Sequence, residues 1–187
     1  YKPGENIGLA LDVASSEFFN PETKGYELKT EKRELTADEW LGTLVDWTKN
    51  YPLISIEDPF DQDDWSHWAA LTAQTAGAKV EQIVGDDLLV TNVKRIERAI
   101  AEKSCSALLV KLNQIGTVTE SLAAMSMASN AGWNNVVSHR SGETEDIFIS
   151  HLAVGTGAGQ LKSGAPSRGE RTAKFNELIR IEEQLNS

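Results

Sequence analysis

The feature that most constrains the fold is a regular alternation of short apolar runs with longer stretches of helical periodicity. The short runs are rich in Val, Ile and Leu and end in polar residues or turn formers. They cover residues 7–14, 53–58, 81–87, 107–113, 135–140 and 159–164. The longer stretches predict helices after Thr36 and at 64–78, 91–103, 117–131, 143–154 and 168–185. Six strand-then-helix units in series predict an α/β fold, a parallel sheet covered by helices.

Helix boundaries are marked by local signals. Thr36 with Glu39, and Thr117 with Glu120, have the spacing of capping boxes. Such a box satisfies backbone N–H groups that the first helical turn leaves without partners. We therefore expect helices to begin at these two threonines.

An open doubly wound sheet and a (β/α) barrel both fit this alternation, and the polar residues favour the barrel. One functional-looking residue lies at or just past the end of each predicted strand, about one βα unit from the next. A barrel with a central site needs this arrangement, whereas a doubly wound sheet gathers its ligand groups at one switch point. No Gly-x-Gly-x-x-Gly follows the first strand. The residues are Asp12, Glu57, Asp86, Lys111, His139 and Lys162.

Three of these residues are carboxylates, the hard oxygen ligands that Mg²⁺ prefers. Alternation along residues 53–57 places Ser55 and Glu57 on the face opposite Ile54 and Ile56, so that Glu57 points into the barrel. For Asp86 and Asp87 alternation does not decide which one points inward. The sequence predicts a metal site at Asp12, Glu57 and Asp86, while acids at strand ends also cap helices or face solvent.

The two lysines are less usual, because burying an ammonium group is costly unless it is paired or catalytic. Lys111 lies opposite Leu108 and Val110 and therefore points inward, as Lys162 is also expected to do. A lysine beside other cations can act as a base, and the alternative is a salt bridge to one of the carboxylates. The run 138–146 is rich in hydrogen-bond donors before a helix and predicts an anion site, unless it is an ordinary polar loop.

Composition limits the class of protein. The chain has 187 residues, a formal charge of -10 and a single cysteine, Cys105. An acidic surface repels phosphate backbones, which argues against general nucleic-acid binding. We find no apolar run long enough for a membrane span and no signal peptide, and we expect a reducing, cytoplasmic location.

These motifs together resemble enolase, the glycolytic phosphopyruvate hydratase. The resemblance rests on six motifs in the same order, over essentially the whole chain. They are Leu11–Phe18, Ser55–Trp65, Gly85–Leu88, Leu109–Thr117, Ser138–Asp146 and Lys162–Pro166.

The resemblance implies an incomplete TIM-type barrel and dehydration of 2-phosphoglycerate to phosphoenolpyruvate, with two Mg²⁺ per active site. It implies that Asp12, Glu57 and Asp86 hold the Mg²⁺ that binds the substrate carboxylate. Lys111 would be the general base, and Lys162 would bind the carboxylate and stabilise the intermediate. The substrate-binding set would comprise Glu57, Asp86, Ser138, His139, Arg140, Ser141 and Lys162.

The chain also departs from the family pattern. We expect residues 1–187 to be about six of eight βα units of the C-terminal barrel domain, without the N-terminal α+β domain, the first barrel strands and the glutamate general acid. The fragment alone is then expected not to be fully active, and the full-length protein to be a homodimer. The alternative is a non-catalytic role for the scaffold, structural or surface-binding in the manner of a plasminogen receptor. A superfamily relative with another substrate is disfavoured by the His139-Arg140-Ser141 loop.

Overall fold

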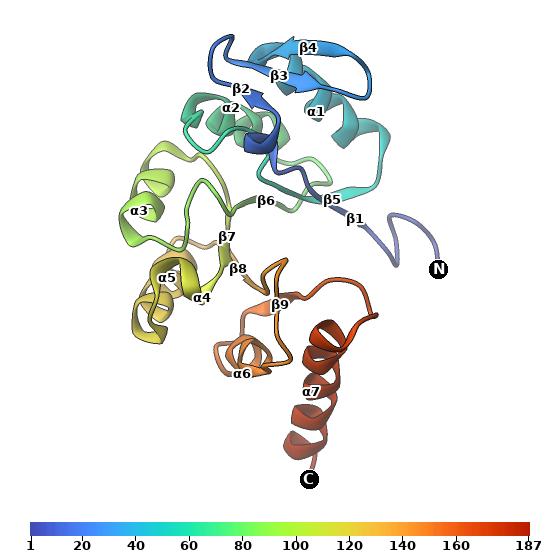
Figure 1. The fold of residues 1–187 in the computed structure, drawn as a ribbon, viewed down its shortest axis with the longest axis vertical. Helices are drawn as coiled ribbons and strands as arrows, with labels where there is room; N and C mark the ends of the chain where they lie inside the picture. Colours follow the sequence, from blue (N-terminus) through green and yellow to red (C-terminus); the bar gives the residue numbers. More distant parts are fainter.

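A computed structural model describes all 187 residues and contains a six-stranded parallel sheet with helices packed outside it (Figure 1). The strand order follows the order along the chain, so each new strand adds to the same side of the sheet. A doubly wound sheet would reverse this order at a switch point. The sequential order therefore favours the barrel type over the doubly wound type. The sheet is curled, and it is open between its two edge strands. The strands are β1 (Leu9–Asp12), β5 (Leu53–Glu57), β6 (Gln82–Gly85), β7 (Ala107–Val110), β8 (Asn134–Ser138) and β9 (Gly159–Lys162).

The helices follow the strands as the periodicity predicts. Thr36 and Glu39 form the complete capping box at the start of the first helix. At Thr117 the hydroxyl accepts from the Glu120 backbone N–H and donates to its carboxylate, 2.6 Å away. A short helix, α4 (Leu112–Ile115), extends the turn after β7. The helices are α1 (Ala37–Asn50), α2 (Trp65–Thr75), α3 (Val93–Glu102), α4 (Leu112–Ile115), α5 (Val118–Asn130), α6 (Phe148–Gly155) and α7 (Gly169–Leu185).

The helix predicted at 143–154 begins later, at Phe148. The Glu143 carboxylate accepts the backbone N–H groups of Arg140 and Thr144, which holds this stretch as a loop. Asp146 then accepts from the Phe148 N–H at 2.9 Å. Side-chain bonds to the backbone thus compete with the first helical turn, as acidic residues often do.

A second, antiparallel sheet inserted between β1 and α1 was not predicted. It consists of β2 (Phe19–Asn20), β3 (Gly25–Leu28) and β4 (Arg33–Thr36), and it lies over α1 in Figure 1. Its anchor is Tyr26, which is fully buried and packs against Phe18, Phe19, Trp40 and Phe60. This aromatic cluster attaches the insertion to the barrel.

The two faces of the main sheet are both apolar at their centre. Ile56, Leu108 and Val110 belong to the large core between sheet and helices. Val84, Ala107, Leu109 and Val136 form a smaller cluster on the other face. The alternation along β7 therefore places Lys111, the next residue after Val110, on the inner face, as predicted.

Candidate active site

The carboxyl ends of parallel strands lie at one edge of the sheet, and the predicted site residues lie there. Asp12, Glu57, Ser138 and Lys162 are the last residues of their strands. Asp86 and Lys111 follow directly after β6 and β7, and His139, Arg140 and Ser141 follow directly after β8. The topology thus brings together residues that are up to 150 positions apart in the sequence.

Lys162 joins the first two carboxylates. Its ammonium group donates to Asp12 Oδ2 and to Glu57 Oε1, each at 2.7 Å. The pKa of Glu57 is raised to about 7, mainly by burial. Lys162 lowers this pKa, whereas the charges of Asp12 and Asp86 contribute to raising it. Burial disfavours the charged form of Lys162, but the bonds to Asp12 and Glu57 outweigh it and raise its pKa. The group is an ion-paired cluster in which one carboxylate is strongly desolvated.

Asp86 is held by a second lysine. Lys111 donates from Nζ to Asp86 Oδ2, and Gln114 donates to Asp86 Oδ1 at 2.9 Å. The Lys111 backbone N–H donates to Thr91 Oγ1 at 3.1 Å, which fixes the start of the turn into α4. Both partners of the ion pair are largely buried. Gln114 was not predicted as a site residue, although it lies within the motif that carries Lys111.

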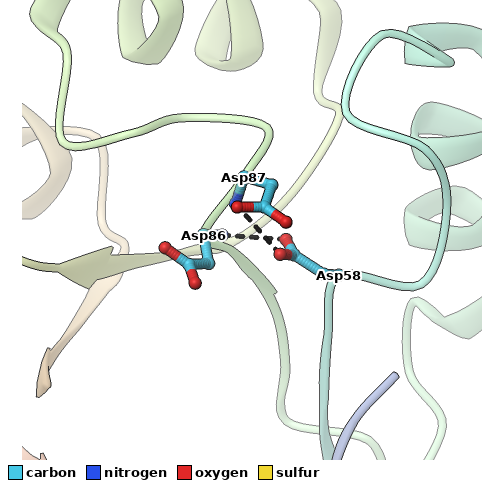
Figure 2. Close-up of side chains that lie close together, drawn as sticks. All are labelled: Asp58, Asp86 and Asp87. Carbon is cyan, nitrogen blue, oxygen red and sulfur yellow. Dashed lines mark hydrogen bonds between the residues drawn. The ribbon is translucent and has the colours of Figure 1, made fainter. Parts of the chain in front are cut away.

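A tighter carboxylate group consists of Asp58, Asp86 and Asp87, each of which has an oxygen within 4.8 Å of the others. Figure 2 shows that the Asp58 carboxylate faces the backbone of its two neighbours, whereas the Asp86 carboxylate points away. The Asp86 and Asp87 N–H groups donate to the two Asp58 oxygens, both at 2.9 Å. Asp58 is 3% exposed, and burial raises its pKa to about 8. Its oxygens are therefore engaged in holding the end of β6, which makes Asp58 a poor metal ligand.

The donor chemistry of the remaining acids fits a divalent cation. Asp12, Glu57 and Asp86 offer only oxygen ligands from three neighbouring strands, the set that suits Mg²⁺. In the structure the two lysines compensate only part of their negative charge. A desolvated carboxylate such as Glu57 needs nearby positive charge to stay ionised, and a cation bound at this position would supply it.

The donor-rich loop after β8 lies beside the lysines. Burial lowers the pKa of His139, and so do the positive charges of Arg171, Lys162 and Lys111. The negative charge of Glu143 raises this pKa, but by less. Arg140 donates from Nη1 to Asn113 Oδ1 at 3.3 Å, which connects the loop to the turn after β7. Arg140 and Ser141 are exposed and Ser138 is buried, with its hydroxyl bonded to the His139 carbonyl.

Two cations that hold this loop were not predicted. Arg171 and Lys174 of α7 donate to its backbone carbonyl groups. The signal was weak, because both residues lie in an ordinary charged helical pattern that resembles a solvent-exposed face.

A cavity of about 830 Å³ opens on the inner face of the sheet. Asp12, Glu57 and Lys162 line it, together with a polar layer in which Gln82 and Gln160 exchange amide hydrogen bonds at 2.8 and 3.0 Å. The ionic cluster therefore borders a space large enough for a small metabolite.

The sequence matches the family model described as "Enolase, C-terminal TIM barrel domain" over residues 1–187. The chain belongs to the enolase family. The family model confirms the barrel prediction, since the six parallel strands form the corresponding part of a TIM barrel.

Individual enolases are similar along nearly the whole chain. Enolase 1 of Methanospirillum hungatei is 56% identical over 187 residues, and Enolase 1 of Desulfitobacterium hafniense is 52% identical over the same length. An enolase of Solanum lycopersicum is 54% identical over 97% of the chain. The chain spans between 41% and 43% of the length of these relatives.

No helix in the structure is sufficiently long and apolar to cross a membrane.

Proposed function

We propose that the full-length protein containing this chain is a Mg²⁺-dependent enolase that dehydrates 2-phosphoglycerate to phosphoenolpyruvate. The observation that carries the proposal is the meeting of two lysines and three carboxylates at the carboxyl edge of one parallel sheet. The family membership supports the same reaction.

The reaction begins with removal of a very weakly acidic proton. Lys111, as the free amine, takes the C2 proton, and the electron pair moves into the substrate carboxylate. That carboxylate then carries additional negative charge, which only concentrated positive charge can stabilise. Lys162 is the protein's own cation at this position. The electron pair then returns to form the C2=C3 double bond as the C3–O bond breaks. The hydroxyl group leaves as water, with a proton from a general acid that the resemblance places outside residues 1–187.

Asp12, Glu57 and Asp86 would hold the metal ion. When bound, Mg²⁺ supplies positive charge beside the substrate carboxylate. In the structure Asp86 is bonded to Lys111, so the base becomes free to accept a proton only when Asp86 has another partner. His139, Arg140 and Ser141 would contact the phosphate, where the second Mg²⁺ of the family would also bind.

The test is the variant Lys111→Met in the full-length protein. Loss of a general base typically lowers the rate by about 10²- to 10⁴-fold, and we expect kcat to fall by this amount with little change in KM. A second readout is exchange of the substrate C2 hydrogen with deuterium from solvent, which should also be lost. Lys94→Met, at an exposed position of α3, is the matched control. Undiminished exchange in Lys111→Met would exclude this residue as the base.

We also propose that residues 1–187 alone lack enzyme-like turnover. The sheet ends in two strands, β1 and β9, with a free edge each, and the cavity beside them is open. A competent site needs a closed wall to exclude water and a general acid to protonate the leaving group. Turnover of 2-phosphoglycerate by the purified 187-residue chain, measured against the full-length protein, checks this. Comparable rates would contradict it.

The family resemblance supports two further proposals about the full-length protein, that it is a homodimer and that it acts in the cytoplasm. The only cysteine of the chain, Cys105, is buried and free. This agrees with a reducing compartment. Sedimentation equilibrium tests the dimer, and cell fractionation tests the location.

A further inference from the structure

Helix α7 directs two buried cations toward the loop after β8. Arg171 is 9% exposed and Lys174 only 1% exposed. Buried cations are normally paired with carboxylates. Arg171, however, forms no ion pair, and its partners are the carbonyl oxygens of Arg140 at 3.0 Å and Ser141 at 2.7 Å.

The third partner of Arg171 is the imidazole ring of His139. Arg171 Nη1 contacts Nδ1 of the ring. A guanidinium group has donors and no acceptor, so Nδ1 must be the acceptor and cannot carry a proton. The neutral ring then has its proton on Nε2, whereas the imidazolium form would direct an N–H group at the guanidinium.

The turn after β9 closes on the same two side chains. A Cβ added at Gly164 would lie 3.0 Å from Arg171 Cδ and 3.3 Å from His139 Cε1. Gly164 has φ +79°, a conformation that side chains other than glycine rarely adopt. The pair thus sets the spacing between the His139 loop and the turn that follows Lys162.

We propose that Arg171 is a positioning residue that holds His139 neutral with its proton on Nε2, so that the loop presents a hydrogen-bond donor to the substrate. This inference rests on the proposed function only for the identity of that substrate. The tautomer and its dependence on Arg171 are properties of the protein without substrate. The same guanidinium fixes the two carbonyl groups that follow His139, which orients the backbone of the loop.

The experiment is NMR of the full-length protein labelled with ¹⁵N-histidine, near pH 7.5 and without substrate. Long-range ¹H–¹⁵N spectra distinguish the two neutral tautomers and the imidazolium, and His139→Asn assigns the signals. We expect a single Nε2–H species for His139 in the wild type and a mixture in Arg171→Met. Lys174→Met removes a neighbouring buried cation that does not contact the ring, and it should keep the Nε2–H species.

Three results would overturn the inference. They are an Nδ1–H or doubly protonated His139 in the wild type, an unchanged Nε2–H species in Arg171→Met, and the same mixture in Lys174→Met. If Arg171→Met does not fold, Arg171→Lys is compared instead: a partial shift toward the mixture supports the inference and an unaltered spectrum contradicts it.

Kinetics separate this inference from the proposed function. Arg171→Met should raise KM for 2-phosphoglycerate by about tenfold, with a smaller change in kcat. The factor corresponds to losing roughly one charge-assisted hydrogen bond, the one from His139 Nε2–H to the substrate. If the tautomer is as proposed but His139→Asn leaves turnover unchanged, the phosphate role of this loop fails and the positioning role of Arg171 stands.

Discussion

Asp58 combines an unusual backbone conformation with a fully engaged side chain. Its φ of 44° lies in the left-handed region, where aspartate and asparagine are tolerated better than most residues. The conformation turns the carboxylate toward β6, where its two oxygens accept the N–H groups of Asp86 and Asp87. The Asp58 N–H donates to the Val84 carbonyl at 3.1 Å. Asp58, the residue directly after Glu57, therefore fixes the position of the Asp86 backbone at the end of β6.

The variant Asp58→Asn tests this role. Asparagine keeps the preference for the left-handed conformation but has one acceptor oxygen, so either the buried Asp86 N–H or the partly buried Asp87 N–H loses its partner. An unsatisfied buried group costs about 1–3 kcal/mol, and we expect the unfolding free energy to fall by this amount in urea denaturation. Asp63→Asn makes the same change at an exposed position of the same loop and should alter stability by less than about 0.5 kcal/mol. Equal stability of the two variants would contradict the positioning role.

The sequence allows a site to be predicted where a charged residue coincides with the end of an apolar strand. Glu57 and Lys111 follow from alternation, since a charge on the inner face of an apolar strand is exceptional. Arg171 and Asp58 could not be found in this way. Their roles depend on side-chain contacts with backbone groups 28 or more residues away, and nothing in their local pattern distinguishes them from surface charges.

At the scale of elements, hydrophobic periodicity predicted the six parallel strands because each is a short apolar run bounded by turn residues. The four central strands, β5 to β8, are largely buried, whereas the edge strands β1 and β9 are partly exposed. The β2–β3–β4 sheet escaped prediction because its strands are short and partly exposed and contain no apolar run. Its stability comes from Tyr26 packing against distant aromatic residues, which is a tertiary contact. The insertion nevertheless ends in a signal that the sequence does show, the capping box at Thr36.

The variant Thr36→Ala should destabilise the protein through helix α1. The Thr36 hydroxyl accepts from the Glu39 N–H at 3.3 Å, and the Glu39 carboxylate accepts the Thr36 N–H at 2.8 Å. Loss of an N-cap side chain costs about 1 kcal/mol, measurable as a lower midpoint in chemical denaturation. Thr43→Ala is the control, because its hydroxyl bonds only to the Glu39 carbonyl within the same helix. That change should cost less than about 0.5 kcal/mol. A larger loss in Thr43→Ala than in Thr36→Ala would show that the cap does not stabilise α1.

At the scale of the whole molecule, the fold concentrates charge of both signs at one end of the sheet. The chain carries a formal charge of -10, and its parallel topology places Asp12, Glu57 and Asp86 on neighbouring strands. Such crowding of acids is tolerated because Lys111 and Lys162 lie between them. The strand order alone accounts for this arrangement, because each βα unit contributes one group to the same edge. A cation that binds only the folded arrangement must therefore stabilise the fold.

This linkage predicts that Mg²⁺ raises the unfolding free energy of the full-length protein. A ligand at 100 times its Kd that binds only the native state contributes about 2.7 kcal/mol. We expect thermal melts in Mg²⁺ to show a higher Tm than melts in EDTA at matched ionic strength. Glu57→Gln should lose most of this gain, because it replaces a buried carboxylate of the cluster. Asp46→Asn, which removes an exposed charge on α1, should retain it. An equal gain in both variants would mean that Mg²⁺ acts elsewhere on the protein and that the three carboxylates are not its ligands.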